Sequence, residues 1–567
     1  MTLRPSTRCA LALAVAACGG SETPSGAVAA DGFCEAALQA VDEHFAGLQA
    51  EAGGGTLVGA GVADLDGGMN PLATTLVASI QHQLHVNLMS LVRLDANLAP
   101  VPYLAESWSL SEDGTLLEFR LRDDVAWHDG TPTRAADVAF TFERARDPET
   151  GYANPAYFRW YENVEVVDDR TVRFRVQPHA QMLETWAVVP ILPAHLLEPV
   201  PPAELATHPF NTRCPVGNGP FRFLEHREGD RWIFARNPAF PDAIGGPPQV
   251  ARYVFRVIPE QTTLLTELLT GAVHVYFDVR PDQAATIAAS QAARVLRAGS
   301  REFAFIAWNA RRAPFGDAAL RRALTQAIDR GAIVTELLGG YGSVAETSVP
   351  PFHWAFDPSV GGAVAHDPTA AAAALAALGW EDRDGDGVRE DASGAELTIE
   401  LLYNQENQLR ATIAQIVQAD LAAVGVAARP QGLEMATVLA RVTDPERREF
   451  DALLLAYETD FRIDDADLFH SGRRGGGLAL AGTANPDLDA ILDRLPLVPD
   501  RDEAVAEWAR YQQALVAEQP FTYLYFPDVL TGVSRRLRNV EIDERGAWRT
   551  IQQWSLEPGP DAAAGQD

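Results

Sequence analysis

The stretch Val125-Ala-Trp-His-Asp-Gly-Thr-Pro-Thr133 runs directly into a segment with apolar residues at helical spacing, which predicts a helix over Arg134–Arg146. Alternating apolar residues predict a strand just before it, at Leu116–Arg122. A hairpin is expected just after it, formed by Val164–Val167 and Thr171–Val176. Strands and a helix therefore succeed one another around this stretch, which is typical of an α/β fold.

The same alternation continues over the rest of the chain. A strand is expected at residues 56–63, and a second hairpin is expected from Phe221–His226 and Arg231–Arg236. Helical spacing recurs at residues 31–52, Thr262–Thr270, Ala318–Ile328, Thr369–Leu378, Gln408–Val424 and Glu503–Glu518. We therefore expect an α/β protein rather than a helix bundle or a β-sandwich.

Composition and charge exclude several classes of function. The chain has 567 residues, of which 47% are apolar, so it is globular and long enough for several domains. Its net charge of −31 argues against nucleic acid as a partner. All 46 basic residues are arginine, which excludes a P-loop lysine and a Schiff-base lysine. Because the Gly-x-Ser-x-Gly and His-Glu-x-x-His motifs are also absent, we expect no enzyme.

The start of the chain is typical of an export signal. Arg4 and Arg8 precede a short uncharged apolar run that ends in Val-Ala-Ala-Cys18, which resembles a bacterial lipobox. We expect residues 1–18 to be a lipoprotein signal peptide with lipidation at Cys18, and residues 19–55 to be a tether and a short helix. An ordinary signal peptide cleaved nearby is the alternative. No later segment is long and apolar enough to span a bilayer, so we expect an exported protein, lipid-anchored in the periplasm or at the cell surface.

Two cysteines remain after such processing, Cys34 and Cys214. Export makes a disulfide chemically possible, and neither cysteine lies in a metal-spaced pair. The sequence leaves open whether they pair.

Several different short motifs follow one another along the chain and together span about residues 56–530. They include Pro102-Tyr-Leu-Ala-Glu-Ser-Trp108, Val125-Ala-Trp-His-Asp-Gly130, Gly217-Asn-Gly-Pro-Phe-Arg-Phe223, Trp308-Asn309, Ala313-Pro-Phe-Gly-Asp317, Ala327-Ile-Asp-Arg330 and Gly379-Trp380. In this order they resemble the peptide/nickel-type solute-binding proteins of ABC importers, which form extracellular solute-binding protein family 5.

The resemblance implies a two-lobed periplasmic-binding-protein-like fold of type II, enlarged by an extra subdomain, with the ligand in the cleft between the lobes. Hinge closure around a ligand would exclude water from its polar groups. The implied parts are a lobe one of residues 56–85, 212–300 and 526–556, an extra subdomain of residues 86–211, and a lobe two of residues 301–525.

The segment Tyr457-Glu-Thr-Asp460-Phe461 follows an apolar run that predicts a buried strand. It resembles the family's aromatic-x-x-Asp-aromatic segment, whose aspartate pairs with the α-ammonium of a peptide. A carboxylate in a cleft can form charge-assisted hydrogen bonds to a cation, and aromatic neighbours help to exclude water. The resemblance adds Trp308 and Asn309 to the expected ligand-binding residues. The alternative for Asp460 is a surface aspartate at the end of a strand.

Asp382-Arg-Asp384-Gly-Asp386-Gly387 has the acidic spacing and the glycine of a calcium loop. The twelfth position of that loop is Ser393, where calcium loops carry a bidentate glutamate. We therefore favour a turn without metal and expect no metal site and no cofactor.

The sequence thus favours a monomeric, lipid-anchored receptor that delivers peptides or peptide-like solutes to the permease subunits of an ABC importer. One alternative is the same fold with a nickel or other metal chelate, or another solute, as its ligand. The other is a sensor or chaperone that feeds no transporter.

Overall fold

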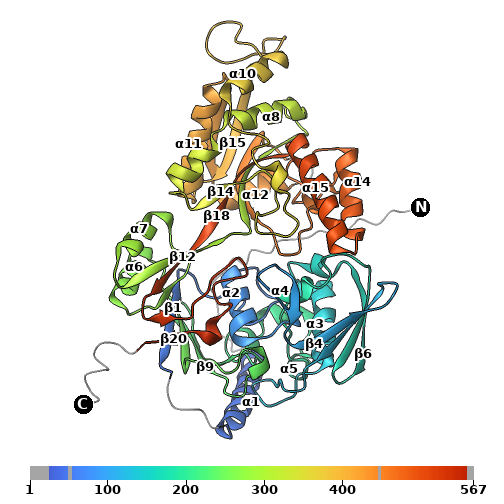
Figure 1. Cartoon of the computed structure of the whole chain (residues 1–567), viewed down its shortest axis with the longest axis vertical. Helices are drawn as coiled ribbons and strands as arrows, with labels where there is room; N and C mark the ends of the chain where they lie inside the picture. Colours follow the sequence, from blue (N-terminus) through green and yellow to red (C-terminus); the bar gives the residue numbers. More distant parts are fainter. Residues whose placement is uncertain (1–24, 49–53, 445–447, 558–567) are drawn as a thin grey trace.

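The computed structural model describes residues 25–48, 54–444 and 448–557, and it shows two lobes stacked along the long axis of the molecule (Figure 1). Lobe one is built around strand β1 (Thr56–Gly61) and lobe two around strand β13 (Glu302–Trp308). A subdomain built around strand β5 (Leu116–Leu121) lies beside lobe one (Figure 1). The predicted α/β, two-lobed fold is therefore confirmed. The predicted signal peptide and Cys18 lie outside the described residues.

The sheet of lobe one has β1 near its centre. β1 pairs in parallel with β10 (Arg252–Val257) and β11 (Val275–Tyr276). The predicted hairpin of β8 (Phe221–Arg227) and β9 (Arg231–Arg236) extends the sheet beyond β10. Buried side chains of two helices pack on one face of this sheet; these helices are α6 (Gln261–Thr270) and α7 (Pro281–Ala289).

The subdomain is an antiparallel sheet covered by one long helix. Its strand order is β4 (Ala105–Leu110), β5, β7 (Thr171–Val176) and β6 (Tyr161–Asp168). The helix α3 (Ala135–Arg146) packs on this sheet through an aromatic core, whose buried members include Phe119, Phe142, Phe174 and Trp186. The helix, strand and hairpin predicted around Val125–Thr133 are confirmed.

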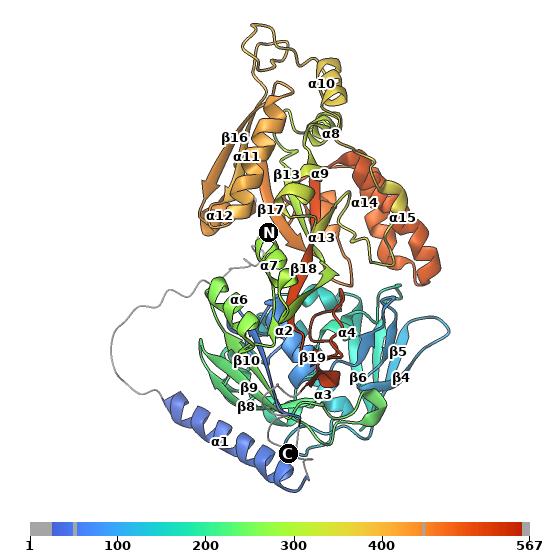
Figure 2. The same ribbon diagram turned by 60° about the vertical axis from the view of Figure 1, so that its left-hand side comes forward.

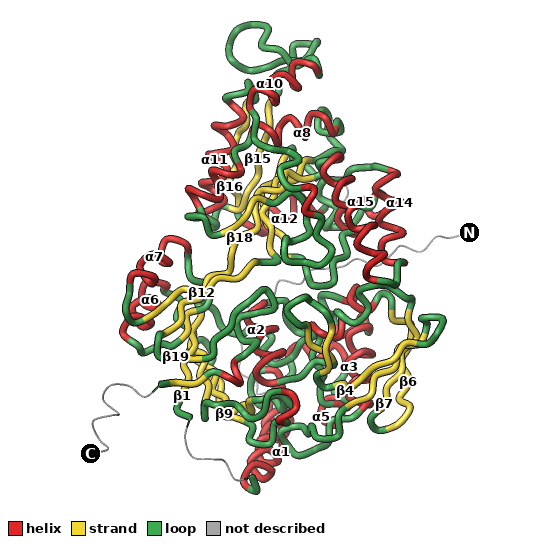
Figure 3. The backbone as a smooth tube through the Cα atoms, viewed as in Figure 1, coloured by secondary structure: helices red, strands yellow, loops and turns green. Residues whose placement is uncertain are grey.

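Lobe two has helices on both sides of its strands (Figure 3). The strands follow the order β16 (Ala427–Leu433), β15 (Thr398–Asn404), β17 (Ala452–Glu458) and β13. Its main helices are α8 (Ala318–Ala327), α10 (Pro368–Ala377), α11 (Gln408–Ala422), α12 (Met435–Thr443), α14 (Pro486–Arg494) and α15 (Arg501–Glu518). The helices predicted in this part agree with the structure to within a few residues at each end.

The strand β18 (Phe521–Ser534) runs through both lobes (Figure 1). Its first residues pair with β13 in lobe two, and its last residues pair with β12 (Ala293–Gly299) in lobe one. Because β12 leads into β13 within a few residues, the chain crosses between the lobes at neighbouring points. Such paired crossings are suited to act as a hinge.

A disulfide joins the N-terminal helix α1 (Ser25–Ala46) to lobe one. Cys34 on this helix bonds to Cys214, with the two Cα atoms 5.3 Å apart. The pairing that the sequence left open is therefore present in the structure. Helix α1 lies along the outside of lobe one (Figure 2) and begins and ends earlier than the predicted range of residues 31–52. The alanine-rich start favours a helix, and Gly47 follows its end.

Candidate functional site

A cavity lies where lobe one, lobe two and the subdomain meet. Lobe two contributes Arg301, Asp460 and Phe461, and the subdomain contributes Tyr152 and Tyr157. The chain around helix α2 (Val77–His82) contributes Gln81, Gln83 and His85. Arg93 comes from the range of the subdomain, and Arg545 and Arg549 come from lobe one.

A second cavity, of about 900 Å³, adjoins the first. The two share Ile80, Asn154, Tyr157, Arg301 and Asp460 as lining residues. These shared residues join the two cavities into one space between the lobes.

The strand β17 ends at Glu458, two residues before Asp460. This places Asp460 at the end of the strand, where its side chain lines the cavity. Three donors meet its carboxylate. The backbone amide of Phe461 donates at 2.6 Å, the guanidinium of Arg301 donates at 3.3 Å, and the Tyr157 hydroxyl also donates to it. Residues from two lobes thus meet at one carboxylate.

Burial raises the pKa of Asp460 to about 6, although the Phe461 amide and the nearby Arg462 oppose this shift. The carboxylate is therefore charged at neutral pH and titrates in the mildly acidic range.

Arg301 connects Asp460 to its surroundings. Its guanidinium donates to Glu458 at 2.8 Å and lies 4.8 Å from the centre of the Phe461 ring. Asp460 and Glu458 thus share one cation, so the pair of carboxylates carries a net negative charge. An ammonium group that approached Asp460 would share it with Arg301.

The facing wall of the first cavity is basic. Arg545 and Arg549 both lie within ion-pair distance of Asp543, whereas Arg93 contacts the hydroxyl and the ring of Tyr103. Arg549 also pairs with Glu541 at 3.2 Å. Three guanidinium groups with two acidic partners leave an excess of positive charge, which favours an anionic group in the cavity.

His85 lies in the same wall and is 8% exposed. Neither of its ring nitrogens has a hydrogen-bond partner among the residues that the structure describes. Burial, together with the charges of Arg93 and Arg549, holds the pKa of His85 well below its usual value. A neutral imidazole therefore offers one donor and one acceptor to a ligand.

The structure brings together three of the five predicted ligand-binding residues. Asp460 and Phe461 line the first cavity, and Tyr457 lines the second together with Asp460. Trp308 and Asn309 lie elsewhere, in the interior of lobe two.

The polar groups of Trp308 and Asn309 are engaged within lobe two. The Trp308 indole donates to Thr522, and the Asn309 amide donates to two backbone carbonyls, those of Arg448 and Phe450. We therefore do not include these two residues in the proposed site.

Sequence reasoning missed the partners of Asp460 and the basic wall. Tyr157 lies 303 residues from Asp460 in the chain, and Arg301 lies 159 residues from it. Arginines are also frequent throughout this chain, so no local signal distinguished Arg93, Arg545 or Arg549.

Contacts beside the cavity hold the subdomain against lobe two. Arg159 forms ion pairs with Asp464 at 2.9 Å and with Asp467 at 3.1 Å. Arg462 donates to the backbone carbonyl of Ala156 at 3.1 Å. The segment that follows Asp460 thus forms a contact between lobe two and the subdomain.

Two lobes linked by crossing strands, with a polar cavity between them, define a two-lobed ligand-binding protein. The chain belongs to the bacterial extracellular solute-binding proteins of family 5, because the model of that family's middle part matches residues 99–477. The predicted family is therefore confirmed. Its members are binding proteins for solutes and not enzymes.

Curated relatives agree with this assignment. The oligopeptide-binding protein AppA of Bacillus subtilis is 27% identical over 82% of this chain and 85% of its own length. The dipeptide-binding protein of Escherichia coli is 25% identical over 79% of this chain and 84% of its own length. The solved structure of Bacillus subtilis AppA in complex with a nonapeptide matches with a TM-score of 0.73 and 26% identity, over 89% of this chain and 99% of that one.

Among the described residues, none of the helices combines the length and the apolar character that a membrane span needs.

Proposed function

We propose that this protein captures peptides between its lobes and delivers them to the permease of an ABC importer. The observation that carries this proposal is the joined space between the lobes, with the largely buried Asp460, whose side chain is 15% exposed, among the residues that both cavities share. Relatives that cover most of the chain are named as oligopeptide-binding and dipeptide-binding proteins, which supports the same ligand class.

The charges in the cavity fit the two ends of a peptide. Asp460 suits the α-ammonium, and the wall with Arg93, Arg545 and Arg549 suits a carboxylate. His85 and the unpartnered carbonyl oxygen of Gln83 can bind backbone groups between them.

Native mass spectrometry of protein purified from its own organism tests this proposal. We expect co-purified masses that fragment into amino-acid residues. A metal chelate or another solute as the sole co-purified ligand would contradict peptide binding and would favour the alternative ligand class.

Binding is proposed to close the hinge at β12, β13 and β18, with lobe one, the subdomain and lobe two divided as the sequence predicts. Small-angle scattering should show a smaller radius of gyration with a co-purified peptide bound than after its removal. Equal radii would argue against closure.

We further propose that the mature protein is a monomer that is held to the membrane by lipid on Cys18, in the periplasm or at the cell surface. The Val-Ala-Ala-Cys end of the apolar run supports this proposal. Cys18→Ser should move the protein from the membrane fraction to the soluble fraction. Unchanged partitioning would contradict the anchor.

A further inference from the structure

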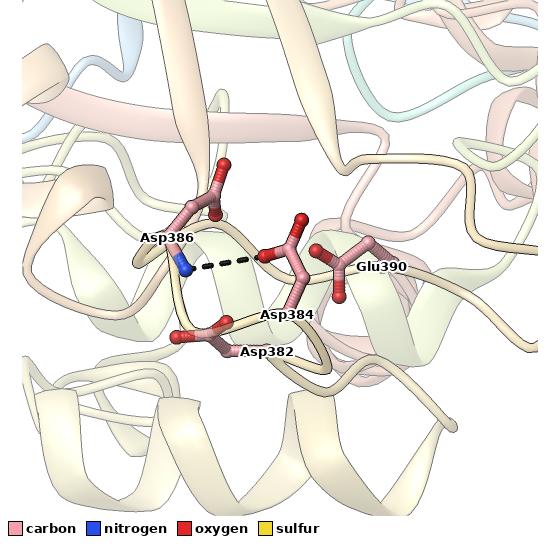
Figure 4. A group of neighbouring side chains, drawn as sticks. All are labelled: Asp382, Asp384, Asp386 and Glu390. Carbon is pink, nitrogen blue, oxygen red and sulfur yellow. Dashed lines mark hydrogen bonds between the residues drawn. The ribbon is translucent and has the colours of Figure 1, made fainter.

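An acidic loop lies between α10 and β15, at the end of lobe two that is far from the interlobe cavities (Figure 1). It carries Asp382, Asp384, Asp386 and Glu390, and one carboxylate oxygen from each lies within 4.8 Å of the others. Figure 4 shows these four side chains gathered around one turn of the loop. Like charges at such distances repel one another unless a cation lies between them.

Glu390 differs from the three aspartates because it is buried, with 5% of its surface exposed. Its Oε2 accepts a hydrogen bond from the backbone amide of Arg383 at 2.8 Å. Its Oε1 is also buried but has no hydrogen-bond partner among the described residues. The carboxylate is directed toward Asp384 (Figure 4). A buried, unpartnered carboxylate oxygen is costly, and it points to a ligand that would satisfy it.

Backbone contacts fix Glu390 in this position. Glu390 forms isolated bridges with Glu381 on one side and with Glu396 on the other. The position of its backbone in the loop therefore follows from the fold of the loop.

Backbone amides orient the three aspartates. Asp382 accepts from Gly385 at 2.7 Å and from Gly387 at 3.1 Å. Asp384 accepts from the amide of Asp386, and Asp386 accepts from the amide of Val388. These bonds turn the carboxylates toward one another before any ion binds.

The loop supplies no cationic side chain to these carboxylates. Within the described ranges, no arginine or histidine forms an ion pair with any of the four, and the neighbouring Arg383 pairs with Glu381 instead. This absence is notable in a chain whose other carboxylates often pair with arginine, as Asp464 does with Arg159.

We propose that Asp382, Asp384, Asp386 and Glu390 bind a calcium ion. All four ligands are hard oxygen donors, with no nitrogen or sulfur that would favour zinc. Calcium accepts irregular oxygen ligation, whereas magnesium requires near-octahedral geometry and retains water.

This proposal replaces the expectation of a turn without metal. That expectation rested on Ser393 at the twelfth position of the loop. The structure instead places a carboxylate oxygen of the ninth residue, Glu390, within 4.8 Å of those of the aspartates. Sites of this kind in extracellular modules bind calcium with a Kd of about 10⁻⁴–10⁻³ M.

Equilibrium dialysis of the full chain against radioactive calcium, after removal of metal with EDTA, tests the site. We expect one calcium ion per chain in the stated Kd range and at least tenfold weaker competition by magnesium. No uptake by the wild type, or equal competition by magnesium, would overturn the calcium assignment.

Variants locate the ion. Glu390→Gln and Asp384→Asn should each weaken binding at least tenfold, and Asp384→Asn retains the acceptor for the Asp386 amide. The control is Asp391→Asn, a half-buried neighbour outside the set, because the asparagine keeps an oxygen that can accept from the Ser393 amide. Its Kd for calcium should equal that of the wild type.

Circular dichroism shows which variants fold. Because Asp384 is exposed, its variant decides the question if Glu390→Gln does not fold. Wild-type affinity in Asp384→Asn would overturn the proposed location.

Discussion

Lobe two carries two carboxylate sites that differ in what the protein supplies to them. At Asp460 the protein provides a guanidinium from Arg301, a hydroxyl from Tyr157 and a backbone amide. At the acidic loop of Asp382 to Glu390 it provides backbone amides only. The net charge of −31 belongs to the whole chain and acts on both sites. The neighbouring groups at each site therefore determine what that site can bind.

The comparison teaches that carboxylates alone do not define a cation site. Asp460 shares the single positive charge of Arg301 with Glu458, so a ligand cation at Asp460 has a guanidinium as a neighbour. The loop has no such internal cation, which suits a small metal ion. We therefore expect that the peptide does not bind at the acidic loop and that the metal ion does not bind at Asp460.

The largest expected effect is on peptide affinity at Asp460. Removal of one partner of a buried charge pair typically costs about 2–5 kcal/mol. Asp460→Asn should therefore weaken binding of a co-purified peptide by roughly 30-fold to several-thousand-fold, at about 1.4 kcal/mol per tenfold. Isothermal titration calorimetry measures this loss.

The matched control for that variant is Asp384→Asn, which removes a carboxylate of the acidic loop. Its peptide affinity should equal that of the wild type. A loss of peptide affinity in both variants would show that the two sites are coupled and would break the comparison.

The pH dependence of peptide binding should give the next largest effect. The pKa of Asp460 is about 6, so its carboxylate is charged above this pH and protonated below it. An ammonium binds the charged form, and the dissociation constant should rise about tenfold per pH unit below pH 6. Calorimetric titrations between pH 5 and pH 8 measure how the dissociation constant changes with pH. This range extends about one unit below and about two units above the pKa.

Asp465, which lines the second cavity, also has its pKa raised to about 6 by burial. The slope is therefore assigned by comparison with Asp460→Asn, in which it should vanish. A slope that persists in this variant would assign the titration to another group.

The smallest expected effect concerns the interlobe contact of Arg159. Its ion pairs with Asp464 and Asp467 are partly exposed, and such pairs contribute about 0.2–1 kcal/mol. Arg159→Ala should thus weaken peptide binding by at most about fivefold.

The control for Arg159→Ala is Arg173→Ala, because Arg173 pairs with Glu118 at similar exposure but within the subdomain. It should leave peptide affinity unchanged in the same calorimetric titration. Equal losses in both variants would mean that the Arg159 contact has no specific part in closure.

Much of the fold could be predicted from the sequence because apolar periodicity is local. The hairpin of β8 and β9 and the helix α3 were expected close to their observed positions. Trp308 shows the limit of motif reasoning, since a family motif on a buried strand marked a residue that packs in the interior.

The candidate site was predictable only in part. Asp460 stood in a recognisable segment, but Tyr157 and Arg301 meet it through the tertiary fold alone. In the acidic loop, the spacing of the aspartates was visible, whereas the burial of Glu390 was not. Long-range partners and burial depend on packing, which local patterns do not encode.

The most direct test of peptide capture at Asp460 is a double-mutant cycle by isothermal titration calorimetry. It combines the wild type and Asp460→Asn with a co-purified peptide in its free and N-acetylated forms. We predict that acetylation weakens wild-type binding about as much as the substitution does, and that it adds little further loss in the variant, because both changes remove the same interaction. Additive losses would contradict the account, since they would show that Asp460 and the peptide ammonium do not meet.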